Sequence, residues 1–403
     1  MTATTVRSGS LLEGLADACS GHSRSGALTI RTELVPSAGP GEPVAPATMA
    51  PAEGQRTGPR WQVERRWESP QADEPRTVVL IDQSQAQRQR IGEALEATAD
   101  VTGMPRIVMD FSALHLPRHV RRRIGHVRWP HRTADVYVYD AMCGDVAFVQ
   151  HPVGERLLAA TAEEAEALFA WFPTAAAFGF WHSNLGKKRH MVRLAGSFQS
   201  EIVGWDPAVG DAPVVRKGLK GDLVNITSDS RIHRADKDDR LAGWEVADKG
   251  DRPSEMGMGQ VLYSEGERQS LRPVSFRRIT QTASLVFPQL RRLSVGRADP
   301  AQDAAARTLV AALVLHGHMG AFGAPFSLRS ACALEPQATT IEIDGESIVV
   351  GADTETLVQD ALARARSMGV PLDGWEREAL VLTPNASLAE LIEKTWPRSD
   401  GGE

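Results

Sequence analysis

Residues 77–97 constrain the fold more than any other part of the chain, because they predict a buried strand that leads directly into a helix. Residues 77–81 form a β-branched and apolar run that follows a proline, as is typical of a buried strand. Asp82 and Ser84 are both N-cap residue types, so a helix is predicted to begin there. Its apolar stripe consists of Ile91, Ala94, Leu95 and Ala99.

The first turns of this predicted helix are rich in amide, hydroxyl and guanidinium donors. Ser84 and Gln87 also have the spacing of a capping box. Free backbone N–H groups and the positive end of the helix dipole favour an anion at such a junction, and a phosphate backbone suits it. The alternative is a solvated amphipathic helix with polar surface residues. The candidate phosphate-binding side chains are Gln83, Ser84, Gln85, Gln87 and Arg88.

The composition is that of an ordinary soluble protein, with 403 residues, 42% hydrophobic and 24% charged. No apolar run reaches membrane-spanning length and the first residues lack a signal-peptide pattern, so a cytoplasmic protein without membrane contact is expected. The cysteines, Cys19, Cys143 and Cys332, have no CxxC spacing. This argues against a disulfide framework or a cysteine zinc site and fits a reducing compartment.

Charge is segregated along the chain, although the net charge is −6. Residues 335–403 contain 14 acidic and 5 basic residues, so the first 334 residues carry a net +3. Two long stretches, 111–134 and 268–298, contain arginines but no acid. Local potential rather than total charge recruits a polyanion, and arginine favours bidentate phosphate contacts. The arginines singled out are Arg121, Arg122, Arg123, Arg277, Arg278, Arg291 and Arg292.

Periodicity and turn residues predict interleaved helices and strands, which indicates the α+β class and is compatible with a ferredoxin-like split β-α-β core. Residues 36–75 are proline-rich and are predicted to leave the core, and residues 206–260 are predicted to be an insertion. Asp344-Gly345 is a favoured hairpin turn. Helices are expected at 8–20, 163–172, 304–316 and 354–368, and strands at 27–34, 106–111, 135–141, 194–205, 274–286 and 341–350.

Three strings in this order resemble a known family: VLIDQSQAQRQRIGEAL at 79–95, FGFWHSNLGKKRH at 178–190 and FSLRSACAL at 326–334. They are similar to the backbone subunit of CRISPR type I-G (formerly I-U) effector complexes, a Cas seven-type member of the RAMP superfamily. The likeness spans roughly residues 10–334. His182 stands where the family string usually carries an acidic residue.

The resemblance implies an RRM-like or ferredoxin-like palm with inserted finger and thumb segments over residues 1–334. It leaves an acidic region, 335–403, packed on or extending that palm. It further implies a non-catalytic subunit that needs no cofactor and polymerises along the crRNA. Its partners are then the crRNA, further copies of itself, other subunits of the effector complex, and target DNA read through the guide heteroduplex. Residues 206–260 are the candidate thumb.

The resemblance also extends the set of expected RNA contacts. A second contact loop is expected at Trp181, His182, Ser183, Lys187, Lys188 and Arg189. Gly317, Gly320 and Gly323 are expected to let the backbone approach RNA closely. Joined to the helix start and the arginine sets, these residues are expected to converge on one groove wide enough for a strand of RNA.

Each of these signals has a structural alternative. The arginines of 118–132 also fit a surface patch or inter-subunit salt bridges, and Trp181 also fits core packing. His316-x-His318, or the Asp229, Asp236, Asp238 and Asp239 group, could belong to a metal-dependent nuclease or RNA-processing enzyme of the same superfamily. An interaction protein without nucleic acid is the third possibility.

Overall fold

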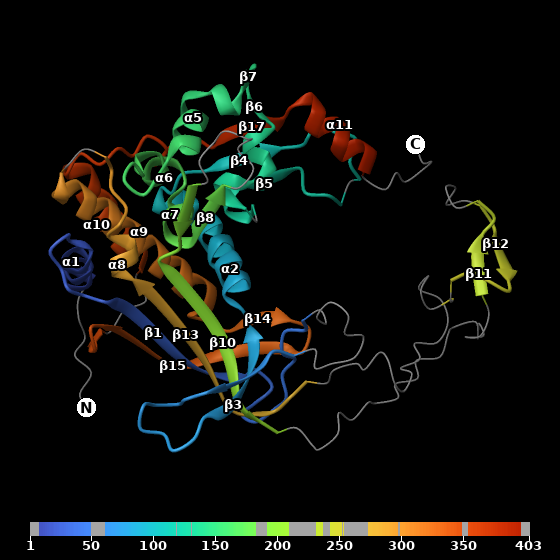
Figure 1. Ribbon diagram of the computed structural model, residues 1–403, viewed down its shortest axis with the longest axis horizontal. Helices are drawn as coiled ribbons and strands as arrows, with labels where there is room; N and C mark the ends of the chain where they lie inside the picture. Colours follow the sequence, from blue (N-terminus) through green and yellow to red (C-terminus); the bar gives the residue numbers. More distant parts are fainter. Residues whose placement is uncertain are drawn as a thin grey trace.

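The computed structural model describes a mixed α and β molecule built on one large antiparallel sheet (Figure 1). The residues that the structure describes are 8–49, 61–117, 119–129, 131–182, 192–208, 231–236, 242–251, 253, 273–296, 299–348 and 354–395.

The large sheet has the strand order β14-β15-β1-β13-β10-β3-β2, and β16 pairs with β15. Every pairing in it is antiparallel. The connection from β1 to β10 contains α2, and the connection from β13 to β15 contains α9. The strands are β1 (Ala27–Pro36), β2 (Val63–Arg66), β3 (Arg76–Asp82), β10 (Phe198–Pro207), β13 (Phe276–Val286), β14 (Phe326–Arg329), β15 (Cys332–Ile343) and β16 (Glu346–Ile348).

Helices cover one face of this sheet, with α1 (Ser8–Cys19), α2 (Ser84–Ala97) and α9 (Pro300–Phe322) against the strands and α10 (Thr354–Ser367) packed on α9 (Figure 1). The alternation along β1 explains this layering. Leu28, Ile30 and Leu34 are buried, whereas Arg31 and Glu33 on the opposite face are exposed. Because strand side chains alternate with period two, one face of the sheet builds the core, and the other face is exposed along β1. At β3 and β10 that second face is covered by a small cluster of Val78, Leu80 and Val203.

A smaller five-stranded sheet lies at the other end of the helical layer, in the order β5-β4-β17-β6-β7 (Figure 1). β17 pairs in parallel with β4, so the acidic C-terminal region supplies its middle strand. Two further ribbons pair only with themselves, β8 with β9 and β11 with β12. The strands are β4 (Ile107–Asp110), β5 (Arg123–Gly125), β6 (Ala141–Cys143), β7 (Val146–Ala147), β8 (Gly179–His182), β9 (Val192–Ala195), β11 (Arg231–Arg234), β12 (Trp244–Ala247) and β17 (Leu380–Pro384).

Short helices connect these sheets. They are α3 (Ala99–Thr102), η1 (His126–Arg128), η2 (Arg132–Ala134), α4 (Val136–Tyr139), η3 (Phe148–Gln150), α5 (Pro152–Ala159), α6 (Glu166–Trp171), α7 (Pro173–Phe178), α8 (Phe287–Leu290) and α11 (Ala386–Thr395). No helix in the described part of the chain is long and apolar enough to cross a membrane.

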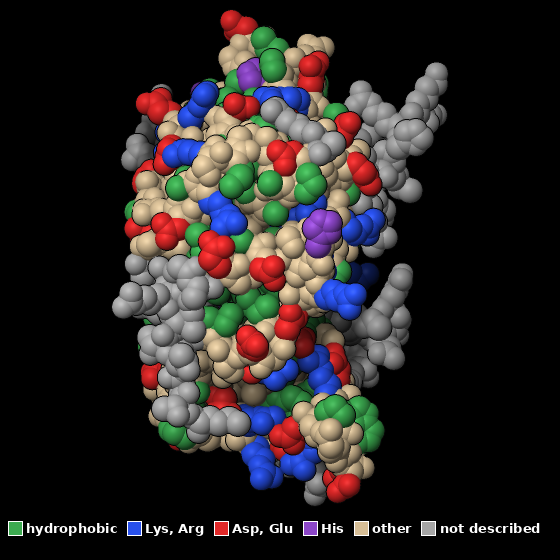
Figure 2. Space-filling view, turned by 90° about the vertical axis from the view of Figure 1, so that its left-hand side faces the viewer, with side chains coloured by type: hydrophobic (Ala, Val, Ile, Leu, Met, Phe, Trp, Pro, Cys, Tyr) green, Lys and Arg blue, Asp and Glu red, His purple; other side chains and the backbone are tan. Residues whose placement is uncertain are grey.

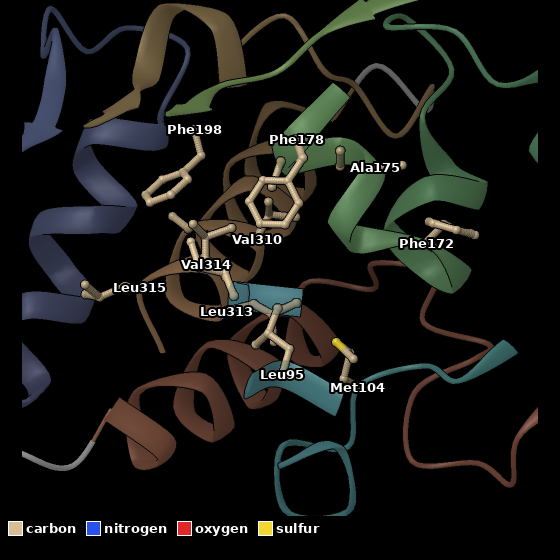
Figure 3. Packing of buried hydrophobic residues seen from close by; sticks show 14 of the residues in the cluster. Leu95, Met104, Phe172, Ala175, Phe178, Phe198, Val310, Leu313, Val314 and Leu315 are labelled. Carbon is tan, nitrogen blue, oxygen red and sulfur yellow. The ribbon is translucent and has the colours of Figure 1, made fainter. Parts of the chain in front are cut away.

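One continuous core joins both sheets and the helices. Figure 3 shows Phe198, Phe178, Val310, Val314 and Leu95 around α9, the central helix of this core. Side chains of α10 belong to the same cluster, so the region after residue 334 is part of the same packed body. The expected division at 334 falls inside β15.

Most sequence-based elements are confirmed. The helices expected at 8–20, 304–316 and 354–368 are α1, α9 and α10, and the buried strand and helix of 77–97 are β3 and α2. The predicted hairpin is also present, because Asp344 and Gly345 both have positive φ (53° and 84°) between β15 and β16. The α+β class is therefore correct. The strand region at 194–205 is two strands, β9 and β10, and α6 is shorter than expected.

The strand expected at 135–141 is wrong, because residues 136–139 form the short helix α4. The Asp135 carboxylate accepts a hydrogen bond from the backbone nitrogen of Tyr137 at 3.2 Å and caps that helix. The alternating Val and Tyr residues favour a strand locally, but the cap and the tertiary packing override that preference.

Gly317, one of the three glycines expected to approach RNA, packs against α2 instead. Gly317 and Gly320 lie within α9, where they face α2. A Cβ atom on Gly317 would lie 2.7 Å from Leu95 Cγ and 2.8 Å from Ile91 Cγ2. These glycines therefore allow two helices to approach each other, and Gly323 caps the C-terminus of α9.

Of the two expected segments, 36–75 is described except for residues 50–60, whereas 206–260 lies largely outside the described residues. In the proline-rich segment 36–75, β2 forms an outer strand of the large sheet. The candidate thumb, 206–260, connects the adjacent strands β10 and β13, and its described part contains β11 and β12.

Candidate nucleic-acid interface

The junction between β3 and α2 differs from the expected cap. Gln83 is the N-cap residue, and its extended backbone (φ −92°, ψ 162°) makes no side-chain capping bond. The side chains of Gln83 and Gln85 are exposed, and Ser84 is half-buried with no hydroxyl partner among the residues described here. Asp82, the other residue expected to cap this helix, is buried and does not cap it.

Asp82 is the centre of a buried ionic network. Its side chain is 2% exposed, and its Oδ1 accepts from Arg329 Nη2 at 3.0 Å. Its Oδ2 accepts from Arg90 Nε at 3.3 Å and from Gln87 Nε2 at 2.6 Å. The carboxylate is therefore the shared partner of two guanidinium groups that come from α2 and β14.

Gln87 extends this network into the sheet. Its Oε1 accepts hydrogen bonds from Ser200 Oγ at 2.9 Å and from Gln281 Nε2 at 2.6 Å. The residue is completely buried. Gln87 therefore ties α2 to β10 and β13, and contact with RNA would require its side chain to leave all three partners.

The three strings that carry the family resemblance meet around α2, although they are far apart in the sequence. Asp82 of the first string pairs with Arg329 of the third. Arg88 of the first string donates to the carbonyl of Phe178 at the start of the second, at 3.4 Å, and to the carbonyl of Phe198 at 2.9 Å. The fold thus places them around one helix.

Beside Arg88 lies a cavity of about 200 Å³. One face of α2 lines it at the helical spacing of 85, 88, 89 and 92, and the other walls come from the η1–η2 segment and α7. Arg132 lines it too, with its guanidinium carbon 5.5 Å from the centroid of the Phe178 ring. The lining residues are Gln85, Arg88, Gln89, Gly92, Val127, Trp129, Arg132, Thr174 and Phe178.

Burial shapes the electrostatics of this cavity. It lowers the pKa of Arg132 to about 10, with a further contribution from the charge of Arg88. Burial also lowers the pKa of Arg88. Both groups still carry a positive charge near neutral pH, and the described lining contains no carboxylate to balance them.

The expected second loop is described only in part. Trp181 and His182 belong to β8, where they pair with Arg193 and Val192 of β9. Ser183, Lys187, Lys188 and Arg189 lie outside the described residues.

The third expected set is divided between the two ends of β13. Arg277 is exposed at its start, where Arg278 pairs with Glu68 at 2.9 Å and stacks over the Trp205 ring. Arg291 and Arg292 follow the other end, about 30 Å away at ~3.3 Å per residue. Arg291 donates to the carbonyls of Ala18 and Ser25, whereas Arg292 is exposed. These four arginines therefore do not share one groove.

Most of the described arginines in the acid-free stretch 111–134 bond to other groups of the same molecule. Arg122 donates to the carbonyls of Leu114 and Leu116, and Arg128 pairs with Glu93 and Glu96 of α2. Arg123 lies 3.7 Å from Asp110, while Arg121 is exposed. Elsewhere on the surface, on the face that Figure 2 shows, acidic and basic side chains are interspersed. Arg118 lies outside the described residues.

Comparison with known protein families bears on the α2 region. Residues 28–209 match the family model of the CRISPR-associated protein GSU0053. The matched segment contains β1, β3, α2, β10 and every residue that lines the cavity. This match supports the conclusion that the chain is a CRISPR-associated protein. No curated protein sequence matches the chain.

The residues suggested for a metal site are arranged differently from a cluster of ligands. His316 bonds Thr98 Oγ1 at 2.9 Å and Thr354 Oγ1 at 3.0 Å, so both ring nitrogens are engaged. Burial lowers the pKa of His318 to about 3. Within the described ranges, no three His, Cys, Asp or Glu side chains are grouped to hold a metal ion. Asp229, Asp238 and Asp239 lie outside those ranges.

Several polar residues of the site were not selected from the sequence. Trp129, Thr174 and Arg329 were absent from the candidate set, because no short-range spacing relates them to α2. Arg90 lies in α2 but was not chosen, because its partner Asp82 was expected to cap the helix. The open face of the large sheet was also missed. A signal for it existed, since Thr280, Thr282 and Ser284 alternate with buried residues along β13.

Proposed function

We propose that this protein is a non-catalytic guide-RNA-binding backbone subunit, which oligomerises along crRNA in a type I CRISPR interference complex and supports recognition of target DNA. The observation that carries this proposal is the meeting of the three family-like strings around α2. Two of these strings, 79–95 and 178–190, lie within the segment that matches the CRISPR-associated family.

The topology supports an RRM-like palm. The strands β15-β1-β13-β10 have the order of a split β-α-β fold, with α2 joining the first pair of palm strands and α9 joining the second pair. β3 is then an additional strand beside β10. In RRM domains, the face of the sheet that lacks helices is the one that receives RNA.

The open face of the sheet suits a strand of RNA that is held without base discrimination. Arg31 is exposed in its centre, and its cross-strand neighbours are Thr282 on β13 and Thr340 on β15. Thr29, Ser284 and Gln199 occupy the adjacent row. Hydroxyl and amide groups bond to phosphate and ribose without reading sequence, while Watson–Crick pairing by the guide selects the target.

Polymerisation follows from head-to-tail contacts, since heterologous interfaces that do not close generate open helical rows. The insertion between β10 and β13 starts where the paired strands end, so it can extend from one palm toward the next copy. We assign it the thumb role, and we assign further effector subunits and target DNA as the remaining partners.

The test is RNA retention after co-expression with a CRISPR array. Arg31→Glu reverses an exposed charge in the centre of the open face, and Arg24→Glu makes the same charge change in an exposed loop before β1. We expect Arg31→Glu to lower bound RNA per protein and to reduce the salt dependence of binding by roughly one phosphate contact, with Arg24→Glu close to wild type. Wild-type protein that purifies without RNA would refute the function.

A further inference from the structure

Three residues that line the cavity beside α2 each carry a buried polar side-chain atom that the described part of the protein does not satisfy. Thr174 is 3% exposed and Trp129 is 2% exposed. Neither the Thr174 hydroxyl nor the Trp129 indole N–H has a hydrogen-bond partner among the described residues, and the same holds for Arg88 Nε. Buried donors are nearly always paired, so three unpaired ones around a single cavity indicate a missing ligand.

The charge of the cavity determines the kind of ligand. Arg88 and Arg132 are close enough for the charge of one to affect the other, and both are largely removed from solvent. Water can satisfy a hydroxyl or an indole N–H, but it does not neutralise two guanidinium groups. A buried charge is stable when it is paired, and arginine pairs preferentially with planar or tetrahedral oxyanions.

The volume of the cavity limits the size of the ligand. A volume of 200 Å³ corresponds to about seven water molecules at ~30 Å³ each, which is enough for a tetrahedral oxyanion with some solvent. It is below the range of ~300 Å³ and more that is usual for sites enclosing a larger organic molecule. The exposed amides of Gln85 and the half-buried amides of Gln89 lie at the rim as additional donors.

We propose that this cavity binds one phosphate group of a nucleic-acid strand, with Arg88 and Arg132 neutralising its charge and Thr174 and Trp129 donating hydrogen bonds. The identity of the strand rests on the proposed function, whereas the phosphate site rests on the cavity. The phosphate is either an internal phosphodiester or the terminal phosphate of the strand, since both present the same oxygens.

The experiment uses full-length protein freed of nucleic acid by nuclease and high salt, titrated with inorganic phosphate by calorimetry. Thr174→Val removes the unpaired hydroxyl with almost no change of shape. Thr308→Val is the matched control, because the hydroxyl of this buried threonine donates to the carbonyl of Ala304 at 2.7 Å. We expect saturable binding in wild type, at least about tenfold weaker binding in Thr174→Val, and unchanged affinity in Thr308→Val.

Thermal unfolding without ligand provides a second readout, in which the two variants should shift the unfolding temperature in different directions. Thr174→Val should unfold at the same or a higher temperature than wild type, because it removes an unsatisfied buried group, whereas Thr308→Val should unfold at a lower one. Absence of saturable phosphate binding, or equal affinity in Thr174→Val, overturns the site. Trp129→Phe, which removes the indole N–H, is the second variant and should weaken phosphate binding in the same direction.

Short single-stranded RNA with and without a 5′-phosphate identifies the source. Equal affinities assign the cavity to an internal phosphodiester, and tighter binding of the phosphorylated strand assigns it to the terminus. The two proposals also fail differently. If phosphate binds the cavity but the co-expressed protein retains no RNA, the function fails and the site stands. If RNA is retained equally by wild type and Thr174→Val and phosphate does not bind, the site fails and the function stands.

Discussion

At the scale of single residues, partner contacts decide which polar side chains are available to a ligand. Arg88 and Gln87 are adjacent in the sequence and belong to the same donor-rich turn. The structure separates their roles, since Gln87 is consumed by three interior hydrogen bonds while Arg88 retains an unpaired Nε in the cavity. Asp82 shows the same effect, because a residue typical of helix caps has become the buried counterion of two half-buried arginines.

The stability of the molecule should depend strongly on Asp82. Asp82→Ala leaves Arg90 and Arg329 without their shared carboxylate, and we expect a loss of about 3–5 kcal/mol in the free energy of unfolding. Asp100→Ala is the control, because Asp100 is 82% exposed and pairs with Arg106 at the surface. That change should cost about 0.5 kcal/mol or less. Urea unfolding measures both, and equal losses in the two variants would contradict the buried network.

At the scale of elements, the approach of α9 to α2 depends on glycine. Gly317→Ala places a Cβ within 3 Å of Leu95 and Ile91, so we expect overpacking to cost about 1–3 kcal/mol of unfolding free energy. Gly320→Ala is the matched control three residues along the same helix, where the nearest atom is Ala94 Cβ at 3.4 Å.

The control should have the opposite sign, because alanine favours a helix interior over glycine by about 0.5–1 kcal/mol. Chemical denaturation of the two single variants measures the difference. If Gly317→Ala were as stable as Gly320→Ala, the close helix contact would not be present in solution.

At the scale of the whole molecule, two histidines in the shared core couple stability to pH. Burial lowers the pKa of His126 from 6.5 to about 4 and that of His318 to about 3. The unfolded chain therefore binds protons below pH 6.5 that the folded protein does not bind. Stability from these groups is complete above pH 6.5 and is lost as the pH falls toward 4, by about 2 kcal/mol per histidine at pH 5.

His318→Leu tests this dependence, since His318 packs between Phe198 and Phe322 in an apolar environment. We expect the difference in unfolding free energy between pH 7.5 and pH 5 to shrink by about 2 kcal/mol in this variant. His115→Leu, a change at a histidine whose side chain is 96% exposed, is the control and should keep the wild-type difference. An unchanged pH dependence in His318→Leu would show that His318 is not buried in its neutral form.

The sequence by itself determined the local structure of this protein. The period of two along β1 and β13, the period of 3.6 along α10, the long alanine-rich apolar run of α9 and the Asp-Gly turn are all set by neighbours within a few residues. The donor-rich face of α2 was visible for the same reason, and so was the α+β class. Even the error at 135–141 arose from a local pattern that a cap and distant packing overrode.

Only the tertiary structure decided which partner each donor has and where the donors meet. Arg132 and Thr174 line the same cavity as Arg88 from segments about 40 and 90 residues away, and Arg88 and Arg132 also donate to backbone carbonyls. Arg122, Arg128 and Arg291 bond to carbonyls or carboxylates elsewhere in the fold. A run of arginines specifies charge, but the partner of each guanidinium depends on contacts that no local spacing encodes. The physical reason is that hydrogen bonds and ion pairs act over a few ångströms in space, whatever the separation along the chain.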